Sequence, residues 1–162
     1  MKAITLWQPY ASLVAIGAKP HETRSWATSY RGQIAIHAGM KPAHELDGMT
    51  SEAICIAFGW PYDPYGEEMS TAARIKALPH GAVVATATLT ECWQVVRHTP
   101  TAVILRQSNG VGEDKISIDA PYLMFGDYRV GRYIWALTDI RELPVPVPAK
   151  GKQGLWNWEV PA

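Results

Sequence analysis

Residues 17–26 place several side chains that can bind ligands close together, directly after an apolar stretch. Lys19 and Arg24 can bind an anionic or carbonyl-bearing ligand, and Glu22 can bind a cation, an amide or the edge of a base. Trp26 adds a flat aromatic face for stacking. This density exceeds what a solvated loop requires. The segment therefore predicts a binding site, although it does not specify a reaction.

The spacing of these charged residues suggests that they act together. In an extended chain alternate side chains point the same way, so Glu22 and Arg24 share a face. The alternative interpretation is a surface ion pair, which adds little stability. We favour a ligand site because Lys19, Trp26 and Arg31 lie in the same stretch, and a lone ion pair would not need them.

A second basic segment covers residues 148–156, after a series of alternating prolines. Lys150 and Lys152 alternate with other residues, Gln153 follows, and the segment ends at Trp156. Such a turn can contact a phosphate backbone and stack a base. The aromatic composition, seven Trp and seven Tyr against two Phe, suits the same use. The alternative is a solvated loop, because charged runs usually face water.

The composition predicts one folded domain with no overall charge. The 162 residues are enough for a single domain, which we place over residues 1–162. Hydrophobic residues make up 48%, which predicts a globule rather than a disordered chain. Acidic and basic residues number 15 each, which argues against a protein held to duplex nucleic acid mainly by charge. A local basic groove is compatible with this balance.

Metal and cofactor patterns are absent from the sequence. The five His lack HxH and HExxH spacing, Cys55 and Cys92 form no CxxC pair, and no GxSxG elbow or phosphate-binding glycine loop is present. We therefore expect neither a metal nor a cofactor. The cysteine usage, the lack of a signal-like N-terminal stretch and the lack of a membrane-length apolar run predict a cytoplasmic protein without membrane contact.

Strands dominate the expected secondary structure. The strand candidates are residues 2–6, 32–38, 82–91, 102–106, 132–140 and 156–160, and the helix candidates are residues 9–16, 42–58 and 67–78. Leu46, Met49, Ala53 and Ile56 recur at helical spacing and are expected to face the core. His37 is expected to point away from the aliphatic face of its strand. No βαβ rhythm is present, so the pattern favours a mixed α+β, mainly β fold: a small, partly closed barrel with helices outside it.

Several short motifs carry a resemblance to a known family. They are GxKxxExR at residues 17–24, LWQPY at 6–10, YRG at 30–32, HA at 37–38, FGDY at 125–128, GRYIW at 131–135 and the turn at 148–156. Over nearly the whole chain this pattern resembles the ASCH (activating-signal-cointegrator homology) domain. The resemblance implies a PUA-like fold, a β-barrel with flanking helices around a cleft, and RNA or nucleotide ligands. Lys19, Glu22 and Arg24 would lie in that cleft.

The first functional hypothesis is the binding of RNA, single-stranded nucleic acid or a modified nucleoside. Lysine and arginine side chains would meet phosphates, tryptophans would stack a base, Glu22 would accept from an exocyclic amine and Gln8 would read a base edge. The expected ligand-binding residues are Trp7, Gln8, Pro9, Lys19, Glu22, Arg24, Trp26, Arg31, His37, Trp135, Lys150, Lys152, Gln153 and Trp156.

The second hypothesis is an amidohydrolase acting on N4-acylated cytidine. Small members of the family resemble enzymes that remove the acyl group of N4-acetylcytidine with a lysine, a threonine three residues later and a glutamate after a later strand. Lys19 occupies the lysine position, Glu22 replaces the threonine and Glu91 matches the glutamate. Glu22 or Glu91 would act as general base, and Arg24 would stabilise the oxyanion.

Two further functions remain open at the level of the sequence. A ribonuclease would pair His37 or His21 with Lys19, because acid–base cleavage of RNA needs a proton-transfer group on either side of the reacting phosphate. A protein adaptor is the other, because coactivators carry domains of this kind, and it would expose a large apolar patch.

Overall fold

The computed structural model describes residues 1–42, 49–65, 69–100, 102–110, 115–116 and 123–160. The described helices are α1 (Tyr10–Ala15), α2 (Ser51–Phe58) and α3 (Thr71–Ala77). The strands are β1 (Lys2–Gln8), β2 (His21–Arg24), β3 (Gly32–Pro42), β4 (Ala82–His98), β5 (Val103–Gln107), β6 (Lys115–Ile116), β7 (Tyr133–Pro148) and β8 (Leu155–Asn157). The fold is therefore mainly β with few helices, as the sequence predicted.

The strands form one mixed sheet in the order β2-β7-β4-β3-β1-β8, and β5 joins it through β4. β1 and β3 are parallel, and the other pairs are antiparallel. Among the described strands no pairing joins β2 to β8, so the sheet they form is open. Closure into a barrel stays a prediction.

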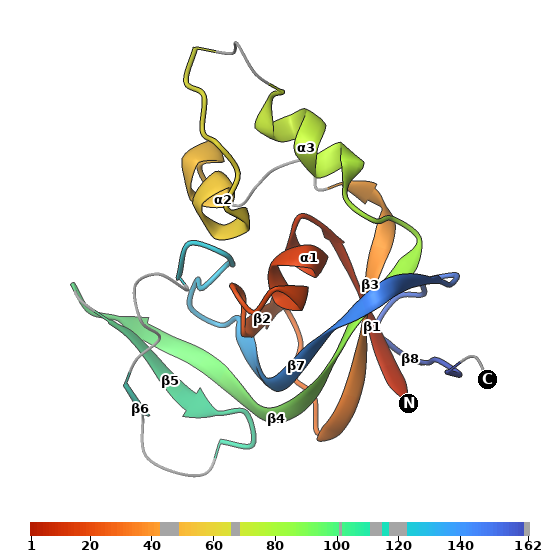
Figure 1. Cartoon of the computed structure of the whole chain (residues 1–162). Coiled ribbons are helices and arrows are strands. Elements are labelled where there is room, and N and C mark those ends of the chain that lie inside the picture. Colours follow the sequence, from red (N-terminus) through yellow and green to blue (C-terminus); the bar gives the residue numbers. More distant parts are fainter. Residues whose placement is uncertain (43–48, 66–68, 101, 111–114, 117–122, 161–162) are drawn as a thin grey trace.

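Two long strands, β4 and β7, curve side by side and hold α1 inside the bend (Figure 1). Their pairing register shifts between Val83 and Ala85, between Thr86 and Thr88, and between Leu89 and Glu91. Such irregularities bend a strand and increase its twist. The curved sheet packs on Ala11, Val14 and Ala15 of α1, together with apolar residues of β1, β3, β4 and β7.

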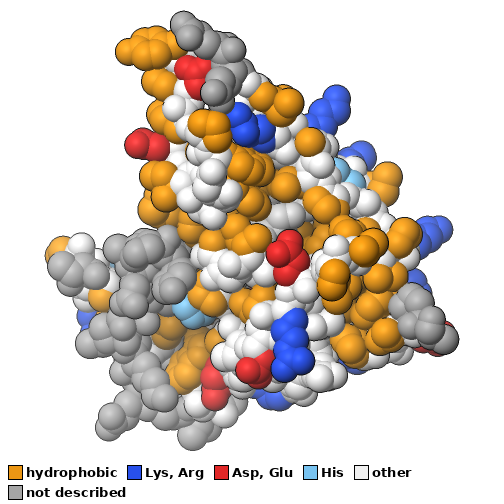
Figure 2. All heavy atoms as spheres, in the orientation of Figure 1, with side chains coloured by type: hydrophobic (Ala, Val, Ile, Leu, Met, Phe, Trp, Pro, Cys, Tyr) orange, Lys and Arg blue, Asp and Glu red, His pale blue; other side chains and the backbone are white. Residues whose placement is uncertain are grey.

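A second, smaller core joins α2 and α3 to α1. It contains Leu13, Met49, Ile54, Ile75 and Phe125, all buried. Figure 2 shows hydrophobic side chains over the part of the surface that α2 and α3 form. None of the helices in the described segments is long and apolar enough to cross a membrane.

The helix expected over residues 42–58 is confirmed only for α2, because Pro42 belongs to a strand and residues 49–50 precede the helix. β3 continues to Pro42, and α2 begins only at Ser51, where the Thr50 hydroxyl accepts a hydrogen bond from the Ala53 amide (3.1 Å). Residues 43–48, including Leu46, lie outside the described residues. Ile56 is exposed, contrary to expectation, whereas Met49 and Ala53 are buried.

The strands β2 and β6 were not expected, whereas the other elements fall near their expected places with shifted ends. The helix expected from residue 67 is α3, which begins after the Ser70 cap. β4 runs beyond residue 91, and β7 runs through the alternating prolines to Pro148. β2 pairs with Tyr133–Ala136, and no described strand pairs with the same edge of the later part of β7. Prolines are tolerated there because they need donate no hydrogen bond.

Candidate functional site

A cleft of about 1340 Å³ lies between β2, the ends of β1 and β3, and the turn that follows β7. Its lining includes Thr5, Trp7, Tyr10, Lys19, Glu22, Arg24, Trp26, His37, Lys41, Arg132 and residues 148–154. The wall at β2 comes from local sequence. Gly17, with a φ of +79°, ends the turn after α1, and the Lys19 amide then donates to Leu13 O (3.0 Å) before the chain enters β2.

The carboxylate of Glu22 bridges two cations. Lys19 Nζ lies 3.0 Å from Glu22 Oε2, and Arg24 Nε lies 3.0 Å from Glu22 Oε1. Lys19 is only 2% exposed and Glu22 only 6% exposed, so this is a buried ion pair. The three charged groups predicted from the sequence therefore meet at one wall of the cleft. Each Glu22 oxygen therefore faces a cation, and both oxygens are engaged in the wall of the cleft.

Both cations of this group also hold the backbone. The Lys19 ammonium donates to the carbonyl of His21 and lies 6.0 Å from the centre of the Tyr10 ring. Arg24 Nη2 donates to Thr5 O on β1 (3.0 Å). The Lys19 contact holds the start of β2, and the Arg24 contact ties β2 to β1, so the two motif cations have a structural role.

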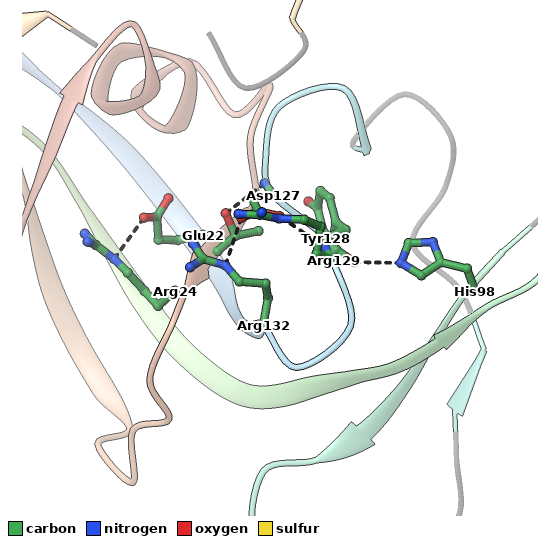
Figure 3. Close-up of polar contacts among 8 residues, drawn as sticks. Glu22, Arg24, His98, Asp127, Tyr128, Arg129 and Arg132 are labelled. Atoms are coloured by element: carbon green, nitrogen blue, oxygen red, sulfur yellow. Dashed lines mark hydrogen bonds and ion pairs between the residues drawn. The ribbon is translucent and has the colours of Figure 1, made fainter. Parts of the chain in front are cut away.

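Behind β2 lies a turn, residues 125–132, that carries more charge. The Asp127 amide donates to Thr23 Oγ1 (3.1 Å), and a β-carbon at Gly126 would lie 2.8 Å from Thr23 Cγ2, so the turn packs directly on β2. Arg132 Nε lies 3.2 Å from Asp127 Oδ2 (Figure 3). The Arg129 side-chain hydrogen bond is the largest cause that lowers the pKa of Asp127, against the opposing effect of burial.

Tyr128 in the same turn is buried close to Glu22. Burial, and then the negative charge of Glu22, raise the pKa of the Tyr128 hydroxyl, which therefore stays neutral. The Tyr128 carbonyl contacts His98 Nε2 (2.8 Å) on the far side of the turn (Figure 3). The turn is thus held between β2 and the end of β4.

The opposite wall is the basic turn, which we define as residues 149–154. His37 Nε2 lies 2.9 Å from Ala149 O, and the Thr5 hydroxyl donates to Lys152 O (3.0 Å). Trp156 Nε1 donates in turn to Thr5 Oγ1 (3.2 Å). Burial lowers the pKa of His37, and its contact with Ala149 opposes this only in part. The neutral ring therefore donates from Nε2, and the turn is seated on β1 and β3.

Nine of the expected ligand-binding residues line the cleft. They are Trp7, Lys19, Glu22, Arg24, Trp26, His37, Lys150, Lys152 and Gln153. The structure thus brings together the two segments that the sequence marked as basic and aromatic, although about 130 residues separate them in the chain.

The remaining expected residues lie elsewhere. The Gln8 side chain is fully buried and donates to Ser12 Oγ (2.8 Å) and Pro79 O (2.7 Å). Its amide is therefore not available to contact the edge of a base. Trp135 is in the core, where the Trp26 ring meets it edge-on at 4.6 Å. The other four are Pro9, which precedes α1; Trp156, which packs against His37; and Arg31 and Glu91, which line a separate hollow.

Sequence reasoning missed several lining residues. Lys41 lies between the strand expected over 32–38 and the helix expected over 42–58, and it belongs to the extended end of β3. Arg132 lies within the GRYIW motif but was not singled out, although a cation directly after a glycine turn was a usable signal. Thr5 and Tyr10 carry no chemistry that marks them without the fold.

No cluster of His, Cys, Asp and Glu suited to a metal ion occurs among the residues whose positions are described. The structure is thus a mainly β fold with a basic, aromatic-lined cleft. The ASCH domain family model matches residues 4–109, more than half of the chain, and the protein therefore belongs to the ASCH domain family. A search of curated proteins found no match to the chain.

Proposed function

We propose that the cleft binds single-stranded nucleic acid, with RNA as the preferred ligand, and that it does so as a binding site rather than as a catalyst. One observation carries this proposal. Of the described residues that line the cleft, six are Lys or Arg and one, Glu22, is a carboxylate, in a chain whose acids and bases are balanced. The six cations are Lys19, Arg24, Lys41, Arg132, Lys150 and Lys152.

This segregation of charge creates a local positive field without a net positive protein. Such a field attracts a phosphate backbone, and the low overall charge limits binding to other polyanions. Trp7 is 53% exposed at the cleft, and Trp26 and Tyr10 lie further in. Exposed aromatic faces stack unpaired bases, which a duplex does not present. The combination favours a single strand.

Fold considerations agree with this proposal. A PUA-like barrel, to which the ASCH resemblance points, binds RNA-type ligands in a cleft between strands and helices. The whole chain would be one such domain, because β8 pairs with β1 and the N-terminal amine donates to Trp158 O (2.8 Å). Both basic walls of the cleft then belong to a single folded unit.

Catalytic alternatives are less well supported by the geometry. Glu91 lines another hollow, so it is not opposed to Lys19 across the cleft. Glu22 already contacts two cations, so the described lining of the cleft offers an amidohydrolase no carboxylate free of an ion pair. For a ribonuclease, His37 is fixed through Nε2 by Ala149, and Nδ1 is buried. We therefore place binding first.

The test is a fluorescence-anisotropy titration with a labelled RNA of about ten nucleotides, within the range that one small domain covers. The wild type is expected to bind this RNA more tightly than the same DNA sequence or an RNA duplex. The double variant Lys150→Gln/Lys152→Gln should weaken binding and reduce the salt dependence, by about 0.7 in log K per log salt for each lost phosphate contact.

The matched control is Lys76→Gln/Arg141→Gln, which removes the same charge from exposed positions outside the cleft. It should change the salt dependence little. Equal effects of the two double variants would mean that the charge acts only through the long-range field. Absence of wild-type binding at low salt would refute the proposed function.

A further inference from the structure

Arg132 differs from the other cations of the β2 wall in that its side chain donates no hydrogen bond to any described residue. Its Nε faces Asp127 Oδ2 at 3.2 Å as an ion pair, but is not aligned for a hydrogen bond. Among the described residues its side chain has no other polar partner. Arg24, by contrast, donates from Nη2 to Thr5 O, and Lys19 donates to the His21 carbonyl. Among the cations of the β2 wall, Arg132 is therefore the one whose guanidinium N–H donors remain available to a ligand.

The position of Arg132 is fixed by a well-held carboxylate. Asp127 accepts from the Arg129 amide (3.1 Å) and from Arg129 Nε (2.9 Å), and its Oδ2 lies 2.7 Å from Arg129 Nη2. The same residue is anchored to β2 through Thr23. One carboxylate thus faces two arginines, which leaves an excess positive charge. Arg132 lines the cleft with its side chain 27% exposed, whereas the Arg129 side chain is 83% exposed and lies outside the lining.

We propose that Arg132 is the residue of the β2 wall that binds a phosphate group of the ligand, and that Asp127 is its positioning residue. The inference rests on the proposed function of the cleft. A guanidinium presents paired N–H donors that match two phosphate oxygens, and partial burial strengthens such a contact. Lys19 and Arg24, the cations of the GxKxxExR motif, then hold Glu22, and Arg24 also holds β1. Arg132 lies outside the segment matched by the family model.

The experiment compares Arg132→Gln with Arg129→Gln by calorimetric titration. Both variants remove one positive charge next to the same carboxylate, so their long-range effects are matched. The probes are cytidine, cytidine 5′-monophosphate and the dinucleotide CpC, which carry no phosphate, a terminal phosphate and a bridging phosphate. Arg132→Gln is expected to weaken binding of at least one phosphate-bearing probe about tenfold, as for the loss of a charged hydrogen bond. Cytidine binding should stay within twofold, and Arg129→Gln should leave all probes within twofold of wild type.

Further variants separate a local contact from a change in the fold. Arg132→Lys keeps the charge but lacks the fork, so its affinity for phosphate-bearing probes should fall between wild type and Arg132→Gln. Asp127→Asn should weaken the binding of the phosphate-bearing probes and leave cytidine binding unchanged. A general loss of structure would not produce this pattern. A near-ultraviolet circular dichroism spectrum checks the packing of the tryptophans.

The outcomes are distinguishable. If Arg132→Gln weakens the binding of cytidine 5′-monophosphate alone, Arg132 contacts a terminal phosphate. If it weakens the binding of CpC, Arg132 contacts a bridging phosphate. If wild type binds the phosphate-bearing probes but Arg132→Gln and Arg129→Gln behave alike, Arg132 is not the contact and this inference alone fails. The inference also fails if Arg132→Gln weakens the binding of cytidine and of its phosphate esters equally. If the wild type binds no probe and no RNA, the proposed function fails, and this inference fails with it.

Discussion

Gly151 lies directly against the imidazole of His37. A β-carbon at residue 151 would be 2.6 Å from His37 Nδ1 and 2.8 Å from Thr5 Oγ1, closer than packed atoms approach. The glycine is needed here because of this close approach and not because of an unusual backbone angle. This close contact explains how the basic turn can lie on β1 and β3 while Lys150 and Lys152 line the cleft.

Replacing Gly151 with alanine should therefore displace the basic turn. We expect Gly151→Ala to lower the free energy of unfolding by about 1–3 kcal/mol, as overpacking of a tight contact does. RNA binding should weaken as well, because the two lysines move. Urea titration followed by tryptophan fluorescence measures the first effect, and anisotropy the second.

A double variant provides the control. His37→Ala removes most of the atoms that the new methyl group meets, so Gly151→Ala should cost less in the His37→Ala background than in the wild type. Strictly additive losses would show that the two residues do not interact, and would contradict the packing described here.

The stability of the protein should fall at acidic pH in a way that depends on His37. Burial lowers the pKa of His37 below its ordinary value of 6.5, so the unfolded chain binds a proton more readily than the native state. Stability is then complete above about pH 6.5 and decreases as the pH falls below that value.

The measurement is the urea midpoint of the wild type and of His37→Gln across pH 5 to 8. Glutamine can still donate to Ala149 O but does not titrate. We expect the variant to lose less stability than wild type on acidification, because the other histidines are common to both proteins. Parallel pH profiles for the two proteins would argue against a buried neutral His37.

The buried ion pair at β2 should be far more important for stability than for ligand contact. Lys19→Met leaves Glu22 buried with one cation fewer, and removal of one partner from a buried pair costs about 3 kcal/mol or more. The double variant Lys19→Met/Glu22→Gln should recover part of this loss, because the unpaired charge is gone. Chemical denaturation of the wild type and the two variants measures the free energy of unfolding. A double variant less stable than Lys19→Met would contradict this account of the ion pair.

The sequence reveals which residues gather at the site but not what each of them does there. The cluster of Lys19, Glu22 and Arg24 was recognisable from residue types and alternation alone, and so was the basic turn. Their roles were not. An isolated sequence cannot show that both Glu22 oxygens face cations, or that Arg132 from a distant turn keeps its donors free, because these depend on the packing of the 125–132 turn against β2.

In the fold, too, the sequence predicts the elements with a local pattern and misses those that distant contacts determine. Strands with apolar alternation, such as β1 and β4, and the helix between Pro9 and Gly17 were predicted because their periodicity is local. The extension of β3 to Pro42 was missed because proline is favoured at the start of a helix, and the sequence does not indicate the pairing of Gln8 with Pro42 that keeps this end extended. The exposure of Ile56 likewise reflects what α2 packs against, and not its spacing.

No deacylation of N4-acetylcytidine is expected. Incubation of the wild type with this nucleoside, followed by chromatographic measurement of cytidine and acetate, should give no release above that of buffer. The reason is that Glu22 is held between two cations and Glu91 lines a different hollow, so no carboxylate among the described lining residues is free to act as a general base opposite Lys19. Turnover that Lys19→Met abolishes, in a variant shown to be folded, would replace the binding hypothesis by an enzymatic one.

Trp7 is the residue on which a base is expected to stack. It lies at the cleft with more than half of its surface exposed, and its ring packs beside Gly39, where a β-carbon would be 3.3 Å from Cδ1. Trp7→Ala should weaken RNA binding by about 1–3 kcal/mol, the value typical of base–aromatic stacking. Stability should change little, because exposed side chains contribute little to folding. Tyr65→Ala is the control, since this exposed ring lies outside the cleft and should leave RNA affinity unchanged. Equal binding by Trp7→Ala and wild type would move the stacking position to Trp26, the other indole that lines the cleft.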